Sequence, residues 1–293
     1  MSAVRDLSRI SPRVYWLPPG KPDRPSLCAV VGEHGTLMLD GGASSAHARA
    51  FLDQLAAEGV APPTATALTH SDWDHVFGAA EVNAPVVAHR LTAEDLVELA
   101  GTDWSDEALD ARVAAGEHRL ELAENIKEEL GSQRDVPIAL ADITFEDALD
   151  LDLGGVDVHI EHVGGDHAPD SSVVYVEQDR VLFLGDSLYA STSGPERTLT
   201  TKLAFPLLDT VLSFDAELFV EGHTESVMSR TEIATLVDDF RRAGTLVDEC
   251  VSSSGAVDER SVLARAEQHL GEPTSDQLRD LIREFIAGHL ASV

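Results

Sequence analysis

The segment THSDWDH, residues 69–75, constrains this chain more than any other part of its sequence. It places four side chains that bind metals well, His70, Asp72, Asp74 and His75, within six consecutive positions. The apolar residues just before it, ATAL, predict a short buried strand that ends at His70. Sheets of the α/β class usually bind ligands at the carboxyl ends of such strands. We therefore expect a sheet that carries a metal centre at one edge.

Three later segments repeat this arrangement, in which a ligand-type residue follows an apolar run and a turn. GGDHAPDS carries His167 in a loop after a predicted strand, LFLGDS ends a strand at Asp186, and VEGHTE carries His223. A single histidine in a loop is common and needs no function. Four such loops that meet at one edge of a sheet would assemble a metal site.

The spacing within the first segment suits two ions. In a loop that leaves a strand, residues two apart can point to the same side, so His70 and Asp72 can share one ion while Asp74 and His75 turn toward a second. A carboxylate such as Asp186 can bridge two ions because its two oxygens point at different metals. Two ions roughly 3.5–4 Å apart can hold a hydroxide and polarise a substrate oxygen.

Strands and helices alternate along the rest of the chain, which indicates the α/β class. The segment SLCAVVGEHGTLMLDGG predicts a hairpin, and the spacing of Phe51 and Leu55 predicts a helix after it. From Thr92 to about Gly131 we expect two or three inserted helices, the first of which begins at a capping box of Thr92 and Asp95. Amphipathic segments after residue 226 predict a helical tail.

The four ligand segments resemble the motifs of the metallo-β-lactamase superfamily. That family carries a His-x-His-x-Asp-His segment, a Gly-His loop, a Gly-Asp carboxylate and a final Gly-His, and HSDWDH, GGDHAPDS, LFLGDS and VEGHTE stand in the same order here. The LDGG turn at Asp40 resembles the family's Asp-x-Gly strand end. The resemblance runs from about residue 15 to about residue 226.

This resemblance implies an α/β fold that is a four-layer αββα metallo-β-lactamase-like sandwich with a helical insertion and a helical C-terminal tail. Residues 1–226 would form that domain, with the insertion at about 92–131, and residues 227–293 would pack on it. It also implies two divalent metal ions, zinc first, with iron and manganese as alternatives. The implied ligands are His70 and His167 for the first ion, Asp74, His75 and His223 for the second, and Asp186 between them, with Asp40 supporting the site.

One position departs from the family pattern, because Asp72 stands where the family has its second histidine. Asp72 can ligate the first metal through oxygen. Alternatively, Asp72 leaves the first position with weak affinity for metal, so that the site binds mainly one ion. A third interpretation is that Asp72 marks an iron site. The flavodiiron branch of the superfamily places a glutamate there and reduces small molecules such as oxygen. An oxygen ligand makes manganese and iron stronger competitors of zinc than a three-histidine site does.

The charge of the chain excludes some partners. Asp plus Glu is 52 and Lys plus Arg is 21, which gives a net charge of −31 that repels nucleic acid and anionic membranes. No apolar run approaches the roughly 20 residues of a membrane span, and the start MSAVRDLSRI lacks a signal core, so we expect a cytoplasmic protein. We expect Cys28 and Cys250 to be buried free thiols. The sequence leaves open whether the protein forms a homodimer.

Together these features predict a metal-dependent hydrolase that uses a metal-bound hydroxide on a small neutral ester, lactone, thioester or amide. Asp74 would orient the nucleophile. Tyr189 stands at the offset where lactone-hydrolysing members place a tyrosine, so it would stabilise an oxyanion or else pack against the site. An iron-dependent oxidoreductase of the same fold and a metal-free binding or regulatory relative are the alternatives.

Overall fold

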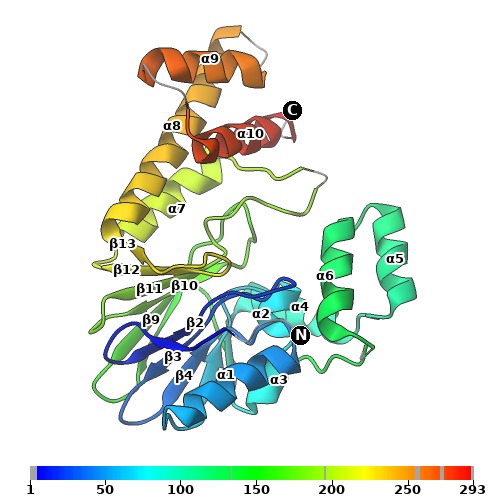
Figure 1. Cartoon of the computed structure of the whole chain (residues 1–293), viewed down its shortest axis with the longest axis vertical. Helices are drawn as coiled ribbons and strands as arrows, with labels where there is room; N and C mark the ends of the chain where they lie inside the picture. Colours follow the sequence, from blue (N-terminus) through cyan, green and yellow to red (C-terminus); the bar gives the residue numbers. More distant parts are fainter. Residues whose placement is uncertain (1–4, 133, 195, 255–257, 271–273, 292–293) are drawn as a thin grey trace.

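Two β-sheets packed face to face form the centre of the molecule, and helices cover the outer face of each (Figure 1). This computed structural model describes residues 5–132, 134–194, 196–254, 258–270 and 274–291. The apolar cluster between the sheets includes Val30 from the first sheet and Val174 and Phe183 from the second. The four-layer αββα sandwich expected from the sequence is confirmed.

The first sheet takes its strands in sequence order. Strands β3 and β4 pair as the expected hairpin, and β4, β5, β6 and β7 run parallel to one another. The carboxyl ends of these parallel strands therefore lie at one edge. The strands are β1 Ser8–Arg9, β2 Val14–Leu17, β3 Leu27–Val31, β4 Thr36–Leu39, β5 Ala65–Ala67, β6 Val86–His89 and β7 Ile143–Phe145.

The second sheet has the order β13-β12-β11-β10-β9-β8. Strands β9 and β11 each pair antiparallel with β10, and β12 pairs parallel with β11. Strands β9, β11 and β12 thus point the same way, so the loops that follow them leave from one edge. The strands are β8 Ala148–Asp152, β9 Asp157–His162, β10 Ser172–Val176, β11 Val181–Gly185, β12 Leu218–Glu221 and β13 Met228–Ser229.

Helix α1 (Ser45–Ala57) packs on the outer face of the first sheet, next to α3 (Ala79–Val82). The helix forms where the sequence predicts it, because Phe51 and Leu55 share the face that is buried against the sheet. The Ser44 hydroxyl caps its first turn by accepting a hydrogen bond from the His47 N–H. Gly59, at a φ of 77°, turns the chain away from the helix end.

The insertion consists of α4 (Arg90–Ala100), α5 (Asp106–Ala115) and α6 (Leu120–Leu130), as expected. The capping box predicted at Thr92 and Asp95 is wrong. The helix begins at Arg90, and its N-cap is His89, which lies three residues before Thr92 and accepts from the Leu91 N–H. Thr92 instead donates to Asp170, so a tertiary contact uses the side chain that the pattern assigned to a cap.

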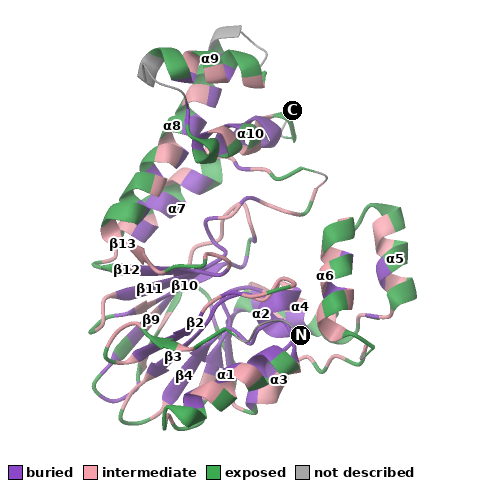
Figure 2. Ribbon diagram, in the orientation of Figure 1, coloured by how far each residue is buried: buried purple, intermediate pink, exposed green. Residues whose placement is uncertain are grey.

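Helices α7 (Thr201–Ser213), α8 (Arg230–Ser254) and α10 (Asp276–Ala291) bury apolar faces against the second sheet and one another, and α9 (Glu259–Leu270) joins α8 to α10 (Figure 2). Their apolar cluster includes Phe219 of β12, Leu208 of α7 and Ile282 of α10. This core contains residues from before and after residue 226. The domain boundary that the sequence predicts at residue 226 stays a prediction.

Among the described helices, none is both long enough and apolar enough to cross a lipid bilayer. The first four residues of the N-terminal segment, which the sequence predicts to lack a signal core, lie outside the described residues. Cys28 is a buried free thiol, as expected, and the side chain of Cys250 is buried as well.

Candidate metal centre

Loops from both sheets bring the candidate ligands together where the two sets of carboxyl strand ends meet. The chain reaches this point after β5, after β9, after β11 and after β12, and in the short helix α2 (Trp73–Val76). Three overlapping groups have ligand atoms within 4.8 Å of one another, and together they contain all the predicted ligands: His70, Asp72, Asp74, His75, His167, Asp186 and His223.

The first group consists of His70, Asp72 and His167. The Asp72 Oδ2 atom lies 3.6 Å from His70 Nε2 and 3.1 Å from His167 Nε2. An ion bound by these atoms would have two nitrogen donors and one oxygen donor. The side chain of Asp72 is 45% exposed, whereas the His70 side chain is 1% exposed, so this group opens outward at Asp72.

The second group consists of Asp74, His75 and His223. The Asp74 Oδ2 atom lies 3.6 Å from His75 Nε2 and 3.1 Å from His223 Nε2. Asp186 lies between the two groups. Its Oδ1 atom is 3.4 Å from His75 Nε2, and its Oδ2 atom is 3.3 Å from His223 Nε2 and 3.7 Å from His167 Nε2. This position, facing both groups, is what a bridging carboxylate requires.

Each of three imidazoles directs its Nδ1 atom at a protein oxygen and its Nε2 atom at the cluster. The His75 Nδ1–H donates to Asp40 Oδ2 over 2.7 Å, and Asp40 Oδ1 also accepts from the Thr69 N–H. Thr69 Oγ1 in turn lies 3.0 Å from the Nδ1 atom of His70. His167 Nδ1 faces the carbonyl of Ala190 at 3.4 Å. Such partners fix the tautomer that leaves Nε2 free to bind a metal.

Gly222 permits the closest approach in the cluster. A Cβ atom at this position would lie 1.9 Å from Asp186 Oδ1 and 3.2 Å from His75 Cε1. A side chain there would therefore displace the carboxylate that lies between the two groups. The Gly-His pair is thus a steric requirement of this cluster, a reason that the sequence pattern alone does not reveal.

Opposite charges shift the titration of the cluster. Burial lowers the pKa of His167, but Asp72 and Asp186 outweigh burial and raise that pKa to about 9. Burial likewise opposes the charge of His223, yet Asp186 and Asp74 raise its pKa to about 10. Burial alone would raise the pKa of Asp186, but His75 and His223 hold that pKa well below its usual value. The pocket therefore stabilises positive charge next to its carboxylates.

The buried polar atoms of the cluster fit a bound divalent cation. The Nε2 atoms of His70, His75 and His167 and the Oδ1 atom of Asp186 are buried, and none of their contacts with the described residues has the geometry of a hydrogen bond, although oppositely charged groups lie close to them. Buried polar atoms are rarely left without partners, so each such atom requires an explanation. A cation among them would supply the missing interaction, and imidazole with carboxylate is a donor set that zinc, iron and manganese accept.

Asp23 is a neighbour of the cluster that sequence reasoning missed. Its Oδ1 atom lies 3.6 Å from His223 Nδ1, and its Oδ2 atom accepts a hydrogen bond from Asn125 of α6. Helix α6 is also tied to the domain by Glu129, which pairs with Arg24 at 2.9 Å. No motif surrounds Asp23, so the sequence carries no signal for this contact.

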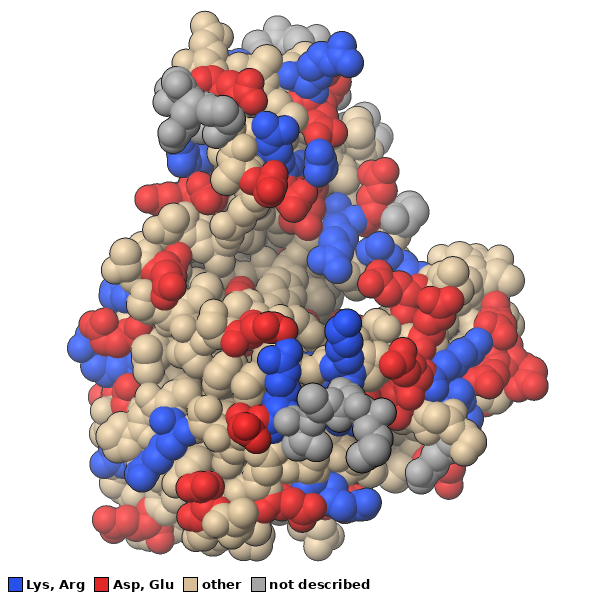
Figure 3. Space-filling view, in the orientation of Figure 1, with Lys and Arg blue, Asp and Glu red and all other residues tan. Residues whose placement is uncertain are grey.

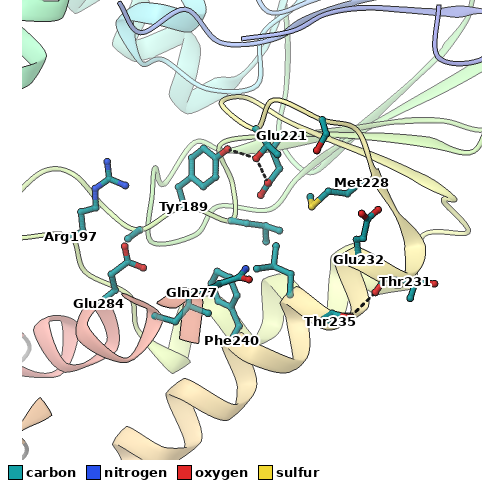
Figure 4. A pocket seen from close by; sticks show the side chains of 16 residues that line it. Tyr189, Arg197, Glu221, Met228, Thr231, Glu232, Thr235, Phe240, Gln277 and Glu284 are labelled. Atoms are coloured by element: carbon teal, nitrogen blue, oxygen red, sulfur yellow. Dashed lines mark hydrogen bonds between the residues drawn. The ribbon is translucent and has the colours of Figure 1, made fainter. Parts of the chain in front are cut away.

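Tyr189 lies between the cluster and a cavity of about 540 Å³ that reaches α8 and α10 (Figure 4). Its ring centroid is 6.2 Å from that of His167 and 6.1 Å from that of His223. The hydroxyl accepts from the His223 N–H at 3.1 Å and lies 3.4 Å from Thr224 Oγ1, which donates to Glu221. Burial, Glu221 and Asp186 raise the pKa of Tyr189, so its hydroxyl stays protonated.

Comparison with known proteins supports one family. The family model described as the metallo-beta-lactamase superfamily matches residues 22–252. No curated protein matches the sequence. A metallo-beta-lactamase from Pontibacter korlensis has a TM-score of 0.57 and 18% identity, over 80% of this chain and 97% of that chain. A metallo-beta-lactamase family protein from Thermus thermophilus has a TM-score of 0.60 and 16% identity, over 97% of this chain and 95% of that one.

A third similar structure is the stereoselective inverting sec-alkylsulfatase Pisa1 from Pseudomonas sp., with a TM-score of 0.64 and 17% identity. The match covers 96% of this chain but 50% of the sulfatase chain, so this protein spans half the length of that relative. At such identities the three structures show a shared fold.

Proposed function

This chain belongs to the metallo-β-lactamase superfamily, and on that premise we propose that it is a hydrolase with two divalent ions that cleaves a small ester, lactone, thioester or amide. Members of the superfamily are commonly metal-dependent hydrolases, and the sulfatase is a hydrolase with the same fold. The observation that carries the proposal is the position of Asp186 between two groups of ligand atoms.

The proposed roles follow from the contacts of each side chain. When bound, two divalent ions supply Lewis acidity, which activates water and polarises a substrate oxygen. Asp74 would orient the attacking water and take up its proton, because its carboxylate lies within the second group, 3.1 Å from His223 Nε2. Tyr189 donates a hydrogen bond to the developing oxyanion, since its contact with Thr224 is long and leaves the hydroxyl proton free to turn.

The donor set favours zinc without excluding harder ions. The imidazoles of His70, His75, His167 and His223 are suited to zinc. Asp72 offers the first group an oxygen donor in place of a third imidazole nitrogen. Oxygen donors favour harder ions, so manganese and iron compete with zinc at this group. The metal content of the purified protein, measured by inductively coupled plasma mass spectrometry, distinguishes these ions.

The test of the proposed function is hydrolysis by the metal-loaded protein, measured with a panel of ester, lactone, thioester and amide substrates. We expect Asp186→Asn to lower kcat/KM by at least about a thousandfold and to lose bound metal, because it removes a negative bridging ligand. The matched control is Asp53→Asn, which changes an exposed carboxylate on α1. Undiminished turnover in Asp186→Asn would contradict the bridging role. Oxygen consumption by an iron-loaded protein that hydrolyses nothing would instead favour the oxidoreductase.

A further inference from the structure

A second cavity, of about 300 Å³, opens from the ligand group that contains Asp72. Its walls are the segment from Ser71 to Trp73 and the insertion helices α4 and α6, with Trp104 from the link between α4 and α5. The volume is at the lower end of the roughly 300–1,000 Å³ of ligand pockets. Because Asp72 belongs both to the ligand group and to the cavity wall, a substrate that reacts at the cluster can extend into this space.

The cavity is acidic. Asp72, Asp95 and Glu98 line it, and its described lining residues include no lysine or arginine. Arg112, which is not among them, contacts the wall, with its guanidinium 5.3 Å from the centroid of the Trp104 ring. Its histidine, His118, contributes no positive charge at neutral pH, because burial and Arg112 lower its pKa. On the face drawn in Figure 3, acidic side chains also gather over the insertion helices. A cation inside this cavity would meet the carboxylates of its lining residues, while Arg112 lies against the Trp104 ring.

Aromatic rings complete the wall. Trp73 and Trp104 both line the cavity. Phe77, which is buried and does not line it, packs against both rings, with its centroid 5.8 Å from that of Trp73 and 4.7 Å from that of Trp104. The indole Nε1–H of Trp104 is buried without a hydrogen-bond partner in the described part of the chain, and the side chain is 6% exposed overall. An acceptor atom on a ligand would satisfy this donor. Rings together with carboxylates recognise alkylammonium groups through their quadrupoles and charges.

Asp95 shows how these carboxylates affect one another. Its Oδ2 atom accepts a hydrogen bond from the Ser71 hydroxyl at 2.9 Å, which ties α4 to the ligand segment. Burial raises the pKa of Asp95, and Asp170 and Glu98 raise it further. A positively charged group between Asp95 and Glu98 would relieve that repulsion.

We propose that this cavity receives the non-reacting arm of the substrate and selects an arm that carries a positive charge, such as an alkylammonium group. That the ligand is a substrate rests on the proposed function, whereas the binding of a cation in this cavity does not. The sequence predicts a neutral substrate, and this proposal replaces it with one that carries a positive charge, because carboxylates line the cavity that would receive the arm. The cavity beside Tyr189 is a weaker candidate, because no residue of the ligand cluster lines it.

Binding is tested with benzyltrimethylammonium, which cannot coordinate a metal, and with its uncharged isostere benzyl dimethyl carbinol. Two of the three tryptophans of the chain line the cavity, so intrinsic fluorescence of the full-length, zinc-supplemented protein reports occupancy. We expect the cation to bind at least about tenfold more tightly than the carbinol, and its affinity to fall with salt. Equal affinities for the two probes would overturn the proposal.

Two variants locate the binding. Glu98→Gln changes an exposed side chain, so the fold should tolerate it, and Asp95→Asn preserves a group that can accept from Ser71. Each should weaken benzyltrimethylammonium roughly fivefold and leave the carbinol unchanged. The control is Glu124→Gln on α6, an exposed carboxylate on the face opposite Leu122 and Ile126. Loss of affinity in the control alone, or in none of the variants, would place the cation elsewhere.

A kinetic comparison separates this inference from the proposed function. The substrates are para-nitrophenyl esters of trimethylammonium-capped butanoate and of its tert-butyl-capped isostere. We expect the charged ester to have the higher kcat/KM, mainly through KM, and Glu98→Gln to reduce that preference roughly fivefold. Hydrolysis of both esters with equal kcat/KM would overturn the proposal for this cavity and leave the proposed hydrolase function standing. Carboxylate-dependent binding of the cation without hydrolysis of either ester, or of any substrate in the panel, would support the cavity proposal and overturn the proposed hydrolase.

Discussion

Asp72 is the residue at which this cluster differs most from the pattern of its superfamily. Its carboxylate oxygen lies near the Nε2 atoms of both His70 and His167, and its side chain also forms part of a cavity wall. One residue thus joins the first ligand group to the space next to it. The three interpretations that the sequence leaves open stay predictions, and these distances agree with the first of them, an oxygen ligand.

We predict that Asp72→Ala lowers the metal content from two ions per chain to one, because the first group keeps only two imidazoles while the second group is intact. Asp72→His should restore two ions and shift the preference toward zinc over manganese, since nitrogen replaces oxygen. Inductively coupled plasma analysis after dialysis against each metal measures both effects. Two retained ions in Asp72→Ala would show that Asp72 is not a ligand.

Gly222 provides a second prediction at this scale. Gly222→Ala adds a methyl group 1.9 Å from Asp186 Oδ1, so the carboxylate must move by more than 1 Å. A misplacement of that size in a reacting centre costs on the order of a hundredfold in rate, and we expect a loss of that order with weaker metal binding. Gly101→Ala is the control, because its Cβ would meet nothing closer than 3.6 Å. An equally active Gly222→Ala variant would contradict the geometry of Asp186.

At the scale of the secondary-structure elements, the common direction of three strands brings the site together. Strands β9, β11 and β12 run the same way, so His167, Asp186 and His223 leave the second sheet at one edge. Strand ends are visible in the sequence as apolar runs that stop at a turn, which is why the meeting of these three side chains could be predicted. Their pairing and distances depend on the register between distant strands, which no local pattern encodes.

Contacts between elements that are distant in the sequence also explain the features that the sequence did not predict. Helix α7 contains Pro206, a residue that argues against a helix interior, yet its apolar face packs into the core with α8 and α10. The contact of Thr92 with Asp170 likewise overrides a local capping pattern. Propensity is a weak guide wherever burial against another element decides the conformation.

Helix α1 contains a buried histidine whose titration affects stability. His47 accepts a hydrogen bond from the Ala43 N–H through Nδ1, and burial, with the positive charge of Arg24, lowers its pKa to about 3. The unfolded chain binds this proton near pH 6.5, so the folded state loses stability as the pH falls from about 6.5 toward about 3. Between pH 7 and pH 5 the loss amounts to about 2 kcal/mol.

We predict that His47→Asn, which keeps an acceptor near the position of Nδ1, removes this part of the pH dependence. Urea unfolding at pH 7 and at pH 5 measures it, and the variant should lose about 2 kcal/mol less than the original protein between the two conditions. The absolute stability of the variant does not enter the test, because only the difference between the two pH values is compared. Parallel losses in both proteins would mean that His47 is protonated in the folded state.

At the scale of the whole molecule, the two sheets meet at the ligand cluster. The first sheet contributes the segment after β5, and the second contributes the loops after β9, β11 and β12. The insertion helices and the C-terminal helices lie on either side of this junction (Figure 1). Ions bound there would link both halves of the sandwich, and the same cations would balance carboxylates in a chain whose net charge is −31.

The most direct test of the metal centre is anomalous diffraction from crystals of the zinc-loaded protein, recorded above and below the zinc absorption edge. We predict two anomalous peaks on either side of the Asp186 carboxylate, one beside His70 and His167 and the other beside His75 and His223. The proposed metal centre would be contradicted if crystals grown with zinc show no peak among these residues, or show His167 and His223 apart from His70.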